Sequence, residues 1–149
     1  MSSLIGFYSL ALGSSLSFLI IFFSIKNFRN FKIFDRRIIF FSFLQLLLVF
    51  ISFFGLIISF INSDFSNETV FNHSHTTKPL FYKISGTWGN HEGSMLLWLC
   101  ILSIFSFFFS FTKNIEDNFQ KLTLIIQAFL HILFGLFIVF TSNPFLVNS

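Results

Sequence analysis

The chain has 149 residues, of which 54% are apolar and only 10% are charged, and its net charge is +3. A soluble domain carries about a quarter charged residues, so this composition cannot cover a water-exposed surface and excludes a soluble enzyme. It also excludes a disordered chain, because disordered segments are poor in aromatic residues and 28 residues here are phenylalanine. The sequence therefore predicts an all-α integral membrane protein.

Four charge-free apolar runs predict about four transmembrane helices, at about residues 4–25, 38–61, 94–111 and 122–140. Each run has the length of about 20 residues that a helix needs to cross about 30 Å of hydrocarbon. The runs do not alternate in polarity, as transmembrane barrel strands do. We therefore treat residues 1–149 as a single membrane domain. We interpret the first run as a retained anchor, since no lysine or arginine precedes it as in a signal peptide.

The basic residues predict the orientation of the helices. Those between the first and second runs and between the third and fourth are Lys26, Arg29, Lys32, Arg36, Arg37, Lys113 and Lys121. The long segment 62–93 contains only Lys78 and Lys83. By the positive-inside rule, the more basic side faces the cytoplasm or the matrix. Both termini and the loop 62–93 are then expected on the periplasmic or intermembrane-space side.

Small or polar residues recur about every fourth position in each predicted helix. The four stripes are Ser9, Gly13 and Ser17; Ser52, Gly55 and Ser59; Ser103, Ser106 and Ser110; and Gln127, His131 and Gly135. Such stripes let helices approach closely, and they offer more packing faces than four helices need. A histidine within a membrane span must face protein, water or a cofactor. His131 therefore leaves two interpretations open, a packing role or a chemical one.

The end of the loop 62–93 concentrates aromatic, glycine and ionisable residues. Asn90, Glu92 or Ser94 suits the cap of the third membrane helix, and tryptophans suit the membrane interface. The three loop histidines, His73, His75 and His91, are in principle ligands for copper, zinc or haem iron. Because nothing in their spacing fixes a ligand geometry, we interpret them as loop residues and assign no metal ligand. Two triplets, Asn67-Glu-Thr69 and Asn72-His-Ser74, match the glycosylation pattern, which matters only in the secretory pathway.

Two motifs resemble a known family. The stretch Trp88-Gly-Asn-His-Glu-Gly-Ser-Met-Leu-Leu-Trp98 resembles the N-terminal part of CcmF, the cytochrome c maturation haem lyase subunit of bacteria and some mitochondria. Phe140-Thr-Ser-Asn-Pro-Phe145 follows in the family's order, and residues 78–82 fit the family's loop before the first motif. The resemblance marks two groups of residues: Trp88, Gly89, Asn90, His91, Glu92, Gly93, Ser94 and Trp98, and then Thr141, Ser142, Asn143 and Pro144.

The resemblance implies the N-terminal subunit of a split haem lyase, which joins the haem vinyl groups to cysteine thiols of apocytochrome c. It implies haem as cofactor, bound mainly by partner polypeptides, because the family's tryptophan-rich segment and haem-ligating histidines are absent from these residues. The first motif is expected to support the haem-handling loop. The expected partners are the remaining CcmF pieces, a haem carrier, an apocytochrome c thiol reductant, apocytochrome c and membrane lipid. No nucleic-acid partner is expected.

Two further expectations concern class and location. The 149 residues contain no complete catalytic site, so the chain is expected to act as one component of the lyase. The family points to a multi-pass protein of the mitochondrial inner membrane, with a bacterial plasma membrane as the alternative. A natural subunit and a fragment of a longer chain fit equally well. The rival function is a small respiratory-complex or transporter subunit whose His131 stripe lines a proton or quinone path.

Overall fold

The computed structural model describes residues 2–28, 36–112 and 115–147, and this part of the chain is all-helical. Four helices are long and apolar enough to cross a membrane: α1 (Ser2–Phe28), α2 (Arg36–Ile61), α5 (His91–Ser110) and α6 (Asp117–Phe140). Two short helices lie between α2 and α5: α3 (Glu68–His73) and α4 (Leu80–Gly86). The predicted fold class, an all-α protein with four candidate membrane spans, is confirmed.

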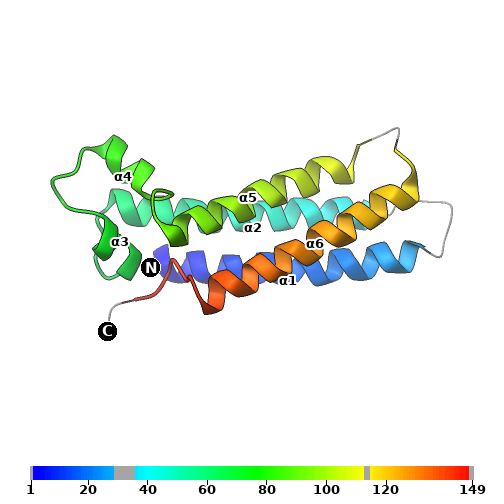
Figure 1. The fold of residues 1–149 in the computed structure, drawn as a ribbon, viewed down its shortest axis with the longest axis horizontal. Helices are drawn as coiled ribbons and strands as arrows, with labels where there is room; N and C mark the ends of the chain where they lie inside the picture. Colours follow the sequence, from blue (N-terminus) through cyan, green and yellow to red (C-terminus); the bar gives the residue numbers. More distant parts are fainter. Residues whose placement is uncertain (1, 29–35, 113–114, 148–149) are drawn as a thin grey trace.

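The four long helices form an antiparallel bundle. Helix α1 packs against α2 and α6, and α5 packs against the other sides of α2 and α6. The start of α1, both short helices and the segment after α6 gather at one end, which we call the loop end (Figure 1). The opposite end, which we call the basic end, carries Lys26, Arg36 and Arg37. Arg29, Lys32 and Lys113, which the orientation prediction also used, lie outside the described residues.

The long helices extend beyond the predicted apolar runs. Helix α5 begins at His91 instead of residue 94, because the side chain of Asn90 caps it and accepts a hydrogen bond from the Gly93 amide at 2.7 Å. Helix α6 begins five residues before its apolar run. Polar residues at these ends are compatible with helix because caps and water satisfy the terminal backbone groups. The loop 62–93 contains α3 and α4, which the sequence analysis did not predict, since helices this short show no clear periodicity.

Except for the half-buried Gln127, the residues of the small-residue stripes face the interior of the bundle. Ser17, Ser52 and Ser103 are fully buried. A Cβ at Gly13 would lie 3.1 Å from Val49 of α2, and one at Gly135 would overlap the Ser14 side chain of α1. The expectation of surplus packing faces is therefore wrong, because the helices of this chain use these faces on one another.

Phenylalanine and leucine cover much of the outside of the bundle. Phe18, Phe40, Phe105 and Phe129 are each more than half exposed. In water such a surface would drive aggregation, whereas in a membrane it faces lipid tails. Because lipid is as apolar as these side chains, helix association must come from close packing and interhelical hydrogen bonds.

Candidate functional site

A hydrogen-bond network crosses the middle of the bundle at His131. The imidazole is 1% exposed. Its Nδ1 lies 3.3 Å from the hydroxyl of Ser17 in α1, and its Nε2 lies 2.9 Å from the hydroxyl of Ser103 in α5. The network reaches α2 through Gln45, whose amide donates a hydrogen bond to Ser17 at 2.5 Å. Each of the four long helices thus contributes a side chain.

The other hydrogen bonds of Ser17 and Ser103 indicate which ring nitrogen of His131 carries the proton. The Ser103 hydroxyl donates to the carbonyl of Leu99 at 2.9 Å, so its oxygen accepts from an Nε2–H on the ring. Ser17 accepts from Gln45 and can therefore donate its own hydroxyl proton to Nδ1. Both ring nitrogens are satisfied with a neutral imidazole that has one donor and one acceptor. This arrangement is that of a histidine which ties helices together.

At the loop end, the first motif forms a tight turn into α5. The Asn90 side chain accepts from the Gly93 amide and donates to the carbonyls of Gly86 at 2.8 Å and Thr87 at 3.3 Å. A Cβ at Gly93 would overlap the Thr87 carbonyl oxygen. The turn therefore requires glycine at this position. Asn90 is the cap, as the sequence analysis considered, and it also holds the preceding turn.

The structure brings the two motifs into contact. The hydroxyl of Ser142 lies 3.1 Å from Nδ1 of His91, and the His91 ring meets the edge of Phe137 with centroids 6.4 Å apart. The second motif is itself fixed, since Asn143 accepts a hydrogen bond from the Phe145 amide at 3.0 Å. Residues 51 positions apart in the sequence therefore share one site at the loop end.

Asn67 completes this end of the molecule, and the sequence analysis missed its role. Its fully buried side chain donates to Ser3 at 3.2 Å and to the Pro144 carbonyl at 2.9 Å, and it caps α3 by accepting from the Val70 amide. In the sequence, Asn67 is followed by Glu68, a common pattern at the start of a helix, and this pattern was a signal for the cap. A fully buried amide that is already hydrogen-bonded does not suit glycosylation.

His91 lies between two recesses. Phe137, which its ring contacts, lines an apolar recess of about 350 Å³ together with Met95, Leu133 and Phe134. Ser142, to which His91 is hydrogen-bonded, lines a polar cavity of about 230 Å³. We call this second recess the carboxylate cavity; its lining residues are Glu68, Thr69, Asn72, His73, Glu92, Thr141, Ser142, Asn143 and Leu146.

The remaining motif residues lie around this site. Trp88 stacks on Phe53 with ring centroids 6.5 Å apart, while Trp98 is 58% exposed on the outside of α5. Ser94 donates to the carbonyl of His91 at 2.8 Å. Gly89 lies against the preceding turn, where a Cβ would come within 3.3 Å of the Ser85 carbonyl oxygen. These residues shape the turn and the membrane-facing surface instead of lining the carboxylate cavity.

The described residues do not form a metal centre from His, Cys, Asp or Glu, so His73, His75 and His91 are not brought together as a ligand set. For haem, the loop end offers an incomplete set of groups. His91 has one ring nitrogen without a hydrogen-bond partner, and the apolar recess lies beside it. The neighbouring carboxylates Glu68 and Glu92 oppose haem propionates, which are also anionic.

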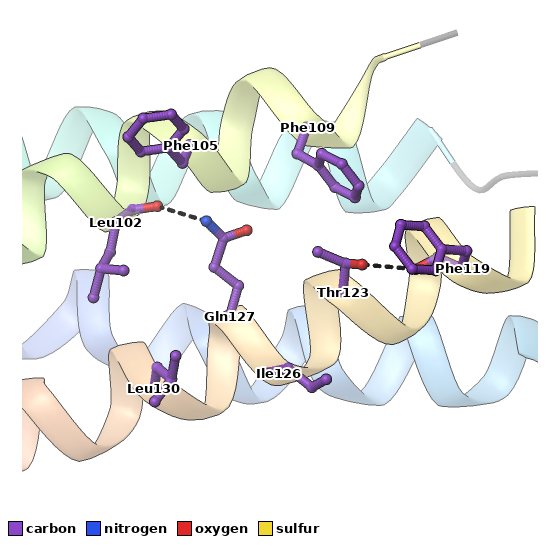
Figure 2. Close-up of a pocket in the computed structure, with 8 residues that line it drawn as sticks. All are labelled: Leu102, Phe105, Phe109, Phe119, Thr123, Ile126, Gln127 and Leu130. Carbon is purple, nitrogen blue, oxygen red and sulfur yellow. Dashed lines mark hydrogen bonds between the residues drawn. The ribbon is translucent and has the colours of Figure 1, made fainter. Parts of the chain in front are cut away.

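A groove between α5 and α6 faces the outside of the bundle (Figure 2). It encloses about 560 Å³ and is lined by apolar residues, with Thr123 and Gln127 as the polar exceptions. The Gln127 amide donates to the Leu102 carbonyl at 3.4 Å, and the Thr123 hydroxyl donates to the Phe119 carbonyl at 2.9 Å. None of its lining residues titrates, so the groove lacks the groups that a proton path needs.

The fold and these contacts define a helical-bundle membrane protein with a built polar site at one end. No protein-family model matches the chain. The cytochrome c-type biogenesis protein CycK of Bradyrhizobium diazoefficiens is 50% identical over 103 residues, which cover 68% of this chain and 16% of CycK. CycK of Rhizobium meliloti is 48% identical over 100 residues, which cover 66% of this chain and 15% of that protein.

A solved structure of the cytochrome c haem lyase CcmF has the same fold, with a TM-score of 0.87 at 21% identity. The match covers 97% of this chain and 25% of CcmF. The chain is thus a homologue of the CcmF and CycK cytochrome c-type biogenesis proteins. It spans about a sixth of the length of the curated relatives named above.

Proposed function

We propose that this chain is the N-terminal membrane part of a haem lyase that attaches haem covalently to apocytochrome c. The observation that carries the proposal is the contact between the two family motifs, His91 to Ser142, in a chain whose homologues are cytochrome c-type biogenesis proteins. The rival function is less well supported, because both ring nitrogens of His131 are engaged within the bundle.

In this proposal the chain provides a scaffold for haem handling. The His91 ring contacts Phe137, which lines the apolar recess, and the residues of this recess suit contact with a flat apolar ligand. Haem is the substrate, and polypeptides carrying the tryptophan-rich segment supply most of its binding site. The two carboxylates beside His91 support this division, since they disfavour haem propionates.

We further propose that the loop end faces the periplasm or the intermembrane space, where haem attachment takes place. The sequence supports this orientation, because the basic residues concentrate in the connections at the opposite end. The homologues named above come from bacteria, and they favour a bacterial plasma membrane over a mitochondrial one. A cysteine scan with an impermeant thiol reagent tests the orientation: a cysteine at Thr76, in the loop end, reacts from the outside, and one at Glu116 does not.

The decisive experiment replaces His91 in cells that depend on this chain. We expect His91→Ala to lower covalent haem in cytochrome c at least tenfold, measured by haem staining of denaturing gels, with the amount of chain in the membrane unchanged. His75→Ala is the matched control, because that imidazole lies in the same loop but outside the site. Normal cytochrome c formation in both His91→Ala and Glu92→Ala would remove the functional role of the motif.

A purification experiment separates the proposal from its rival. The tagged chain, extracted in mild detergent, is expected to bring with it a polypeptide that contains the missing tryptophan-rich segment. Recovery of respiratory-complex subunits without maturation proteins would favour the rival function instead.

A further inference from the structure

The carboxylate cavity contains a buried carboxylate oxygen that has no hydrogen-bond partner. This atom is Oε2 of Glu92. Thr69, which is only 4% exposed, also lines the cavity. Glu68 adds a second carboxylate, and none of the cavity's lining residues is a lysine or an arginine. A buried carboxylate oxygen without a partner is costly, so the site is built for a ligand that brings hydrogen-bond donors and positive charge.

The position of Glu92 in the first turn of α5 explains only part of this arrangement. A carboxylate there is favoured by the helix dipole, but the dipole supplies no donor to the buried Oε2 atom. Lys78 does not fill the role, since its ammonium donates to the His73 carbonyl at 2.8 Å and does not line the cavity.

We propose that the carboxylate cavity binds an arginine side chain of a partner protein. A guanidinium has five donors in a fixed fork, which match acceptors that arrive from α3, α5 and the segment after α6. An ammonium has three donors and satisfies fewer of them. The volume of about 230 Å³ has room for one long side chain. A metal ion is a poorer fit, because the described residues provide no group of three His, Cys, Asp or Glu side chains that could hold one.

The proposed occupant is a protein side chain because most of the length of the homologues lies outside the part that this chain matches. The chain covers 25% of the solved CcmF structure and 15–16% of the two CycK relatives. The cavity is formed by both family motifs together with α3, at the loop end where a partner has access. This inference does not depend on haem attachment, since it concerns only the charge and donors of the occupant.

Carbon-13 NMR tests the site directly. The chain has three glutamates, Glu68, Glu92 and Glu116, so protein labelled at the glutamate carboxyl carbon and held in nanodiscs of neutral lipid gives three assignable signals. The probe is N-acetyl-arginine amide. We expect saturable shifts at Glu92 and Glu68 and no shift at Glu116, which lies at the basic end. The neutral analogue N-acetyl-citrulline amide is expected to leave all three unchanged.

Variants and a second ligand make the test decisive. Glu92→Gln is expected to weaken binding at least tenfold, Glu68→Gln several-fold, and the matched control Glu116→Gln not at all, with folding checked by circular dichroism. Absence of a saturable shift at Glu92, equal shifts with the citrulline analogue, or a parallel shift at Glu116 would overturn the proposal. Tighter binding of free arginine than of the capped amide would show that the cavity binds the free amino acid, and it would overturn the assignment to a partner protein. Because this experiment does not involve haem, its failure is distinguishable from failure of the lyase proposal.

Discussion

The network at His131 and the carboxylate cavity at the loop end differ in the hydrogen bonding of their polar side chains. Around His131, hydrogen bonds connect Gln45 to Ser17, Ser17 to His131, His131 to Ser103, and Ser103 to the Leu99 carbonyl. At the carboxylate cavity, the buried Oε2 atom of Glu92 has no hydrogen-bond partner. Both regions contain a histidine, but among the described residues the unpartnered buried carboxylate lies at the loop end, beside a polar cavity. This carboxylate distinguishes the candidate site from the hydrogen-bonded network at His131.

The largest expected effect comes from Gly93, on which the geometry of the loop end depends. Gly93→Ala places a methyl group on the Thr87 carbonyl, a backbone atom that cannot rotate away, and we expect it to lower the free energy of unfolding by about 3 kcal/mol. Titration with SDS, followed by circular dichroism, measures this loss. Gly86→Ala is the control, because its Cβ would meet Phe60 at an ordinary 3.5 Å. Equal stabilities of the two variants would show that the turn adapts.

The network at His131 is expected to be structural and to give the next largest effect. His131→Ala removes two interhelical hydrogen bonds and leaves a small cavity, and we expect a loss of about 2 kcal/mol. His131→Gln, which keeps a donor and an acceptor, is expected to recover part of this stability. The amount of covalent haem per folded molecule should not change in either variant. A folded His131→Ala protein that fails in cytochrome c formation would assign the network a functional role.

The sequence predicted the membrane helices well because their signal is local. Length and apolarity alone identify a span, and they place helices near their observed positions. The meeting of His91 with Ser142 was not predictable, since a hydrogen bond between residues 51 positions apart depends on how α5 and α6 pack. The two motifs identified both residues as candidates, but they did not predict that the residues are in contact. Asn67 was missed for the same reason, because its partners Ser3 and Pro144 are distant in the chain.

Substitution of Asn67 tests whether α3 and the segment after α6 unfold together at the loop end. Asn67→Ala removes a helix cap and the hydrogen bond to Pro144, so we expect a loss of about 1 kcal/mol that is concentrated at the loop end. Hydrogen exchange of the Glu68 amide, which donates to the Leu146 carbonyl at 2.9 Å, should accelerate while amides at the middle of α5 remain protected. Asn72→Ala is the control, because its exposed side chain lines the cavity without stabilising α3. Unchanged exchange of the Glu68 amide would show that the start of α3 does not depend on the contact between Asn67 and the second motif.

The smallest effect is expected at Gln127. Its weakly hydrogen-bonded amide can be compared with that of Gln45, which belongs to the network at His131. The only described hydrogen bond of Gln127 is long, at 3.4 Å to Leu102, and its Oε1 atom is buried without a partner. Gln127→Leu removes both the bond and the unsatisfied atom, so stability in detergent should change by less than about 0.5 kcal/mol. Gln45→Leu removes the donor to Ser17 and should cost about 1 kcal/mol. If Gln127→Leu were the more harmful of the two in native membranes, a donor from a partner would occupy the α5–α6 groove there and satisfy the Gln127 Oε1 atom.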